Sequence, residues 1–149
     1  MKFNITIEHD GNNFVAYCNN LIGCYAQSKT ENSVKQLIQE TISLYISNYE
    51  QRSEPFNPSS EEPQLNYQIR FKRFSAEQLR NILIKSNYVL DHITSNILLF
   101  RKIDFPFHRM AIPNINNLSP IIIKKIFGEA NVTIVRTDRI RENVKYRQG

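Results

Sequence analysis

The chain has 149 residues, of which 41% are hydrophobic and 22% charged, and this composition is typical of a globular protein and excludes a disordered one. The length suits one ordinary domain or two very small ones. Residues 1–64 carry four basic and eight acidic residues, whereas residues 65–149 carry fifteen basic and six acidic ones, so the net charges are −4 and +9. The sequence therefore predicts two modules. The second has the charge either of a polyanion-binding module or of a basic surface that only aids solubility.

Several classes of protein are excluded by what the sequence lacks. Cys18 and Cys24 are too few for a disulfide framework or a structural zinc site. No apolar run reaches the roughly 18 residues that a membrane span needs, and the start at residues 1–5 is too short and too polar for a signal peptide. We expect a cytoplasmic protein with reduced cysteines, no cofactor, no metal and no membrane partner.

The first half is predicted to form three strands followed by a helix. Two segments of alternating polarity flank a turn of asparagine, aspartate and glycine, which indicates a hairpin. Thr30 is the candidate N-cap of the helix, whose apolar residues recur at spacings of three and four. The expected elements are strands at 3–9, 14–18 and 23–26 and a helix from Thr30 to Tyr49.

The second half is predicted to have the order helix, three strands, helix. Ser75 and Gln78 have the spacing of a capping box, and Pro120 stands in the first turn of the last helix, where proline is tolerated. The alternating segment 65–71 predicts a further strand before this module. The other expected elements are a helix from Ser75 to Asn87, strands at 88–90, 97–101 and 109–112, and a helix at 118–130.

Four short motifs in the first 50 residues resemble the HicB antitoxin family. They are the Asp10-Gly11 turn, the strand Phe14-Val15-Ala16-Tyr17-Cys18, the turn Leu21-Ile22-Gly23-Cys24 and the helix start Thr30-Glu31. The resemblance implies a partial ribonuclease-H-like β-β-β-α module that lacks nuclease activity. Two departures stand out: Asn19 takes the place of the usual proline, and Ser28-Lys29 the place of the usual glycine.

Residues of about 74–135 resemble the HicA toxin family, in the strand start Asn87-Tyr88-Val89-Leu90 and in the last helix from Leu118-Ser119-Pro120 to Ile126-Phe127. The resemblance implies a double-stranded-RNA-binding-like fold. The family's Gly-Ser-His motif falls on Ser95-Asn96-Ile97, so its catalytic histidine is Ile97 here, and its Pro-x-His is Pro113-Asn114-Ile115. Isoleucine has no proton to transfer, which excludes acid–base catalysis at that position.

These observations predict an α+β protein with four parts: a HicB-like antitoxin module (1–50), a linker rich in Pro, Ser and Glu (51–64), a HicA-like module (65–135) and a basic tail (136–149). We expect a non-catalytic, toxin–antitoxin-derived fusion in which the acidic half covers the basic half and which acts by binding nucleic acid or a protein partner. Double-stranded RNA is contacted mostly through phosphates and 2′-hydroxyls, so scattered basic residues suffice. The candidate phosphate contacts are Arg101, Lys102, Arg109, Lys124 and Lys125.

Two alternative functions remain open at this stage. In one, the second half is an active ribonuclease whose base is His92 or His108; in the other, the chain is an assembly scaffold without a nucleic-acid role. Tyr17 and Tyr25 fit either base stacking or core and dimer contacts. The expected partners are duplex RNA or DNA and a cognate toxin or antitoxin protein, and the expected assembly is a homodimer.

Overall fold

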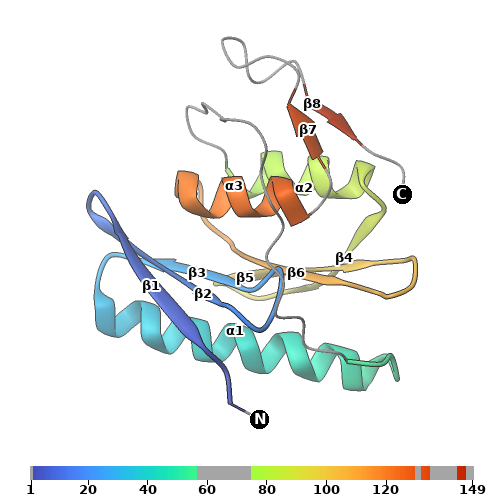
Figure 1. Ribbon diagram of the computed structural model, residues 1–149, viewed down its shortest axis with the longest axis horizontal. Coiled ribbons are helices and arrows are strands. Elements are labelled where there is room, and N and C mark those ends of the chain that lie inside the picture. The colour runs from blue at the N-terminus through green and yellow to red at the C-terminus, as the bar shows by residue number, and fades with distance from the viewer. Residues whose placement is uncertain (1, 57–74, 130–131, 135–143, 147–149) are drawn as a thin grey trace.

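The computed structural model describes residues 2–56, 75–129, 132–134 and 144–146. The fold is α+β, with a central layer of strands, helix α1 on one face and helices α2 and α3 on the other (Figure 1). In chain order the elements are β1 (Ile5–Asp10), β2 (Asn13–Cys18), β3 (Tyr25–Ser28), α1 (Glu31–Gln51), α2 (Ala76–Lys85), β4 (Tyr88–Ile93), β5 (Ile97–Lys102), β6 (Arg109–Pro113), α3 (Pro120–Glu129), β7 (Val132–Ile134) and β8 (Val144–Tyr146).

Two antiparallel sheets of three strands each make up the central layer, in the orders β1-β2-β3 and β4-β5-β6. In the first sheet Ala16 pairs with both Ile7 and Ala26, and in the second Leu99 pairs with Ala111. A bulge between Leu90 and His92 shifts the register of the β4–β5 pair. The short strands β7 and β8 pair with each other. Strand β8 lies within the tail at 136–149, for which the sequence predicted no element.

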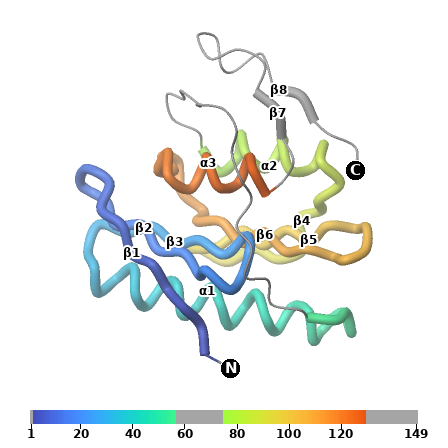
Figure 2. Tube along the Cα trace, in the orientation of Figure 1, coloured from blue at the N-terminus to red at the C-terminus, as the bar shows by residue number. Residues whose placement is uncertain are grey.

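The two sheets meet edge to edge at β3 and β6, which the trace shows as one continuous layer (Figure 2). The backbone N–H of Ala111 donates to the carbonyl oxygen of Gly23 at 2.6 Å, and Cys24 forms a parallel bridge with Ala111. Gly23 has a φ of +88°, and a Cβ atom there would lie 2.2 Å from the carbonyl oxygen of Arg109. Only glycine fits this junction, because any side chain would collide with the neighbouring backbone.

Each face of the layer has its own apolar core, and both halves of the sequence contribute to both cores. Val15 and Tyr25 of the first half pack beneath α2 and α3, among residues such as Phe127. Ile97 and Leu99 of the second half pack beneath α1. The sequence predicted two modules in contact with each other, and the described residues of the two halves share both cores.

The helix starts follow the expected capping chemistry. Thr30 Oγ1 accepts a hydrogen bond from the backbone N–H of Ser33 at 3.1 Å, and Ser75 forms a complete capping box with Gln78. These contacts confirm the predicted N-caps of α1 and α2. Among the residues that the structure describes, no helix combines the length and apolarity needed to cross a bilayer.

The first part of the predicted linker belongs to the packed structure. Helix α1 continues to Gln51, and the ring of Phe56 lies 5.4 Å from that of Tyr49 and 6.5 Å from that of Tyr45. Phe56 thereby extends the core beneath α1. The rest of the predicted linker, the strand expected at 65–71 and the tail apart from β8 lie outside the described residues.

Candidate functional site

Ile97, which stands where the HicA motif has its histidine, is the first residue of β5 and is buried. Its side chain is 2% exposed and belongs to the core beneath α1, with Leu99 and Ala111. Its backbone N–H donates to Thr94 Oγ1 at 2.9 Å, which orders the β4–β5 turn. A side chain at this position therefore faces helix α1 of the first half and not the solvent.

Beyond this apolar core, the end of α1 is joined to the second sheet by a buried polar network centred on Arg109. Arg109 is 0% exposed, and its guanidinium donates to Glu54 Oε1 at 2.5 Å and to Asn48 Oδ1 and the carbonyl oxygen of Phe107, both at 2.6 Å. The guanidinium carbon also lies 4.0 Å from the centroid of the Tyr49 ring. Arg109 was predicted to contact phosphate, but its guanidinium is buried in the structure and its charge is compensated by Glu54.

Two further ion pairs extend this network towards the surface. The other carboxylate oxygen of Glu54 accepts from Arg101 at 3.1 Å, and Asp91 accepts from Arg52 and, at 2.8 Å, from Asn48 Nδ2. Burial alone would raise the pKa of Asp91, but the hydrogen bonds from Arg52 and Asn48 outweigh burial and lower the pKa. Arg101 is thus engaged by an acidic residue of the first half, as Arg109 is.

The three remaining candidates for phosphate contact are lysines. Lys124 is exposed on α3, while Lys125 is half-buried, with its ammonium 4.2 Å from the centroid of the Tyr17 ring. Lys102 is half-buried at the end of β5. Since α3 and α1 cover opposite faces (Figure 1), the lysines of α3 are separated from Arg101 and Arg109, which bond to Glu54 after α1, and the structure does not gather the five predicted residues on one surface.

The main described ranges also carry little of the basic excess of the sequence. Residues 2–56 and 75–129 together contain eleven basic and ten acidic residues, a net charge of +1. The rest of the sequence contains eight basic and four acidic residues, a net charge of +4. Most of the basic excess that suggested a polyanionic partner therefore falls outside the two main described ranges.

The two histidines proposed as substitute bases do not lie together. His92 is exposed on β4, opposite Leu99, whereas His108 precedes β6, where its carbonyl oxygen accepts from the backbone N–H of Lys102. Burial, and then the charge of Lys102, lowers the pKa of His108, which favours the neutral ring. They lie beside different residues of β5, and neither stands at the Ile97 position.

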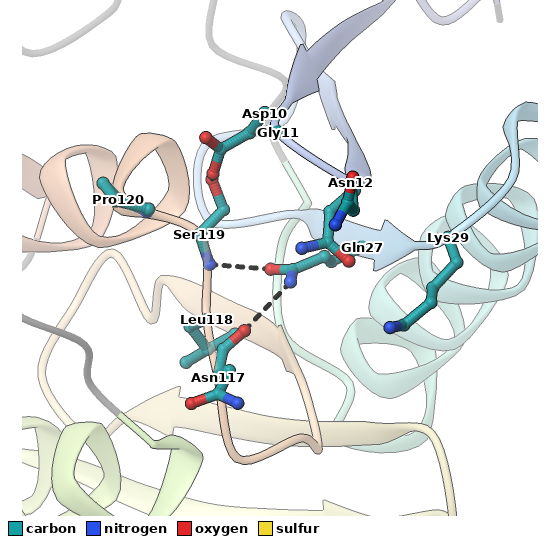
Figure 3. A pocket seen from close by; sticks show the side chains of 10 residues that line it. Asp10, Gly11, Asn12, Gln27, Lys29, Asn117, Leu118, Ser119 and Pro120 are labelled. Carbon is teal, nitrogen blue, oxygen red and sulfur yellow. Dashed lines mark hydrogen bonds between the residues drawn. The ribbon is translucent and has the colours of Figure 1, made fainter.

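One cavity of about 900 Å³ opens where the β1–β2 turn, the end of β3 and the start of α3 meet (Figure 3). Its polar groups mostly serve the fold: Ser119 Oγ donates to Asp10 at 2.6 Å, and Gln27 accepts from the Ser119 N–H at 2.7 Å and donates to the Asn117 carbonyl at 2.9 Å. Lys29 points towards the cavity (Figure 3). The described lining offers no histidine or cysteine.

In the part of the chain that the structure describes, the thiols and carboxylates form no metal-binding cluster. Cys18 and Cys24 are buried, and burial raises the pKa of each thiol, which disfavours the reactive thiolate. Within residues 2–56 and 75–129 no group of three or more His, Cys, Asp or Glu side chains is placed to hold a metal ion.

Sequence reasoning missed Glu54 and Phe105. Glu54 was placed in the linker, and no local pattern announces that it pairs with two arginines 47 and 55 residues further along the chain. Phe105 is 76% exposed between β5 and β6. The sequence feature that could have revealed this exposed ring is the run Phe105-Pro106-Phe107 between two predicted strands. No protein-family model, curated protein or solved structure matches this chain.

Proposed function

We propose that the chain is a non-catalytic fusion of a HicB-like and a HicA-like module, in which the first module permanently covers the second. The observation that carries this proposal is the burial of Ile97 beneath α1. The residue that replaces the toxin histidine is apolar, and it is buried in the core that the antitoxin-like helix covers. Both changes act in the same direction, because one removes the base and the other removes access to substrate.

The contacts between the halves support permanent cover. The first half supplies Glu54 and Asn48 to Arg109, and Gly23 to the junction with β6. Because both halves belong to one chain, their effective concentration stays high at any protein concentration. An acidic module that neutralises arginines of its neighbour is the arrangement expected of an inhibitor and its target.

The activity left to such a fusion is binding, and we place it on α3. Lys124 is exposed there and Lys125 is half-buried beside Tyr17, and α3 covers the face of the sheet opposite α1. Contacts from so few cations give weak binding of duplex RNA that tolerates any sequence and weakens with salt by roughly one unit of slope or slightly less per phosphate contact.

The test uses the full chain with duplex RNA in metal-free buffer. We expect no cleavage, and weak binding whose salt dependence becomes shallower by roughly one unit of slope or slightly less for each phosphate contact removed by Lys124→Ala or Lys125→Ala. Lys35→Ala is the matched control, because Lys35 is exposed on α1, on the other face.

Cleavage that disappears in His92→Ala or His108→Ala would replace this proposal with an active ribonuclease. Absence of RNA binding at low salt would favour the scaffold alternative. The observation that favours the scaffold alternative is the net charge of only +1 over residues 2–56 and 75–129.

A further inference from the structure

The cavity between the β1–β2 turn, the end of β3 and the start of α3 has a buried floor whose hydrogen-bonding groups are only partly used by the fold (Figure 3). A carboxamide has two N–H donors and two acceptor lone pairs. The bonds of Gln27, which is 8% exposed, to Asn117 and Ser119 use one donor and one acceptor site. Asp10 accepts from Ser119 through Oδ2. Among the described residues, one N–H of Gln27 and Oδ1 of Asp10 therefore remain for a ligand.

Three further polar side chains stand at the open side of the cavity. Asn12, Lys29 and Asn117 are exposed and belong to its lining, and Lys29 points towards it (Figure 3). Within the part of the chain that the structure describes, none of these three side chains makes a hydrogen bond or an ion pair. They add donors and acceptors to the cavity that the fold does not need.

The charge of the cavity does not suit an ionic ligand. Asp10 and Lys29 are the ionisable side chains of the described lining, so their charges cancel. The N-terminus of α3 would attract an anion, but Ser119 Oγ already accepts from the Ile121 N–H at 3.2 Å and donates to the Asp10 carboxylate. An anion placed there would meet a negative charge, and a cation would have a single carboxylate to bind.

The remaining lining distinguishes between neutral ligands. Leu118 and Pro120 are its apolar members, and the described lining contains no aromatic ring. A lipid would lack apolar surface, and a nucleobase would lack a ring on which to stack. A molecule with several hydroxyl groups fits, because each hydroxyl donates and accepts, as a carboxamide does. The volume of about 900 Å³ lies within the range of small-molecule sites.

We propose that this cavity binds a neutral sugar of about one to three units. Asp10 and Gln27 bind hydroxyl groups at the floor, and Asn12, Lys29 and Asn117 bind those nearer the opening. The floor is ordered before the sugar arrives, because its side chains are already held by bonds to α3 and the segment before it. This inference does not depend on the proposed function, since it concerns a neutral ligand and not RNA on the lysines of α3.

The test is an NMR titration of the isotope-labelled full chain with D-glucose, D-galactose, D-ribose, N-acetyl-D-glucosamine, maltose and maltotriose. Each sugar is taken to about 50 mM, so that dissociation constants in the millimolar range are measured. We expect at least one sugar to shift the side-chain amide signals of Asn12, Gln27 and Asn117. Its affinity should not change with salt, because neither the sugar nor the lining carries a net charge.

Three variants locate the site. Asn12→Ala, Lys29→Ala and Asn117→Ala should each raise the dissociation constant by about 2- to 10-fold, the effect of losing one hydrogen bond. These side chains make no bond within the described fold, so the rest of the spectrum should stay unchanged. Asn81→Ala is the matched control, because Asn81 is an exposed asparagine on α2 outside the lining.

Two outcomes would overturn the proposal outright. One is that no sugar of the panel shifts these signals, and the other is that the three variants bind the sugar as the unchanged chain does. Inorganic phosphate is titrated in parallel. If phosphate shifts the same signals in a salt-dependent manner and the sugars do not, the cavity is an anion site and the proposal is wrong.

Discussion

Two of the connections between the halves differ in chemistry. At the β3–β6 junction, backbone meets backbone and Gly23 leaves no space for a side chain. At the end of α1, charged side chains around Arg109 provide the contact. The first connection depends on shape and the second on charge compensation. Any side-chain atom added at the first connection should therefore destabilise the protein, whereas the second should be destabilised when one partner of an ion pair is removed and the other charge stays buried.

The largest effect is expected from Gly23→Ala. Its left-handed φ strains any other residue by about 1–3 kcal/mol, and the collision with the Arg109 carbonyl adds about 1–3 kcal/mol of overpacking, so the free energy of unfolding should fall by up to about 6 kcal/mol. Gly11→Ala is the control, because Gly11 also has a positive φ but its Cβ would meet nothing within 4 Å. Urea denaturation measures both. Equal losses in the two variants would show that the junction is not sterically tight.

Arg109→Ala comes next, with an expected loss of about 3–5 kcal/mol, because it breaks a buried ion pair and leaves Glu54 without its buried guanidinium partner. The double variant Arg109→Met with Glu54→Gln should lose less than Arg109→Ala alone, since neither charge of the buried pair is then left alone, and Arg101, which loses Glu54 as its partner, keeps 19% of its side chain exposed to water. Denaturation of both variants by urea makes the comparison. A double variant that is less stable than the single one would mean that the network acts by shape and not by charge.

Ile97→His tests the apolar surface beneath α1. The imidazole would be buried among apolar side chains that offer it no hydrogen bond, so we expect the free energy of unfolding to fall by about 1–3 kcal/mol. Ribonuclease activity should not appear, because α1 still covers the position. Thermal unfolding and cleavage of labelled RNA are the two measurements. The appearance of cleavage in this variant would show that the cover opens.

The smallest effect is expected at the exposed end of the network, where Arg52 pairs with Asp91. Asp91→Asn should cost less than about 1 kcal/mol at neutral pH, because Arg52 is largely solvated and water screens the pair. The pKa of Asp91 is lowered in the folded protein, so its stabilisation is complete above the ordinary value of 3.8 and is lost as the pH falls below it. The stability difference between wild type and variant should therefore shrink between neutral pH and pH values below 3.8. A difference that does not vary over this range would contradict the lowered pKa.

The sequence predicted the elements better than their assembly. Thr30, Ser75 and the alternating strands signal their structures locally, and α1, α2 and both three-stranded sheets form where expected. The bridge between Cys24 and Ala111, which joins the two sheets, and the role of Glu54 depend on residues tens of positions apart, and local patterns carry no such information. The basic candidates were chosen by charge alone, which does not tell a solvated lysine such as Lys124 from a buried arginine such as Arg109.

The hydrogen bonds of Ser119 have a consequence for folding during synthesis. They join Asp10 and Gln27 to a segment that follows them by 109 and 92 residues, and α3 completes the core over Val15 and Tyr25. Contacts of such high sequence separation form slowly, because a long loop must close first. On the ribosome, the face of the first sheet opposite α1 stays uncovered until α3 has emerged. A nascent chain of this protein therefore passes through a stage at which its apolar strands are accessible to chaperones.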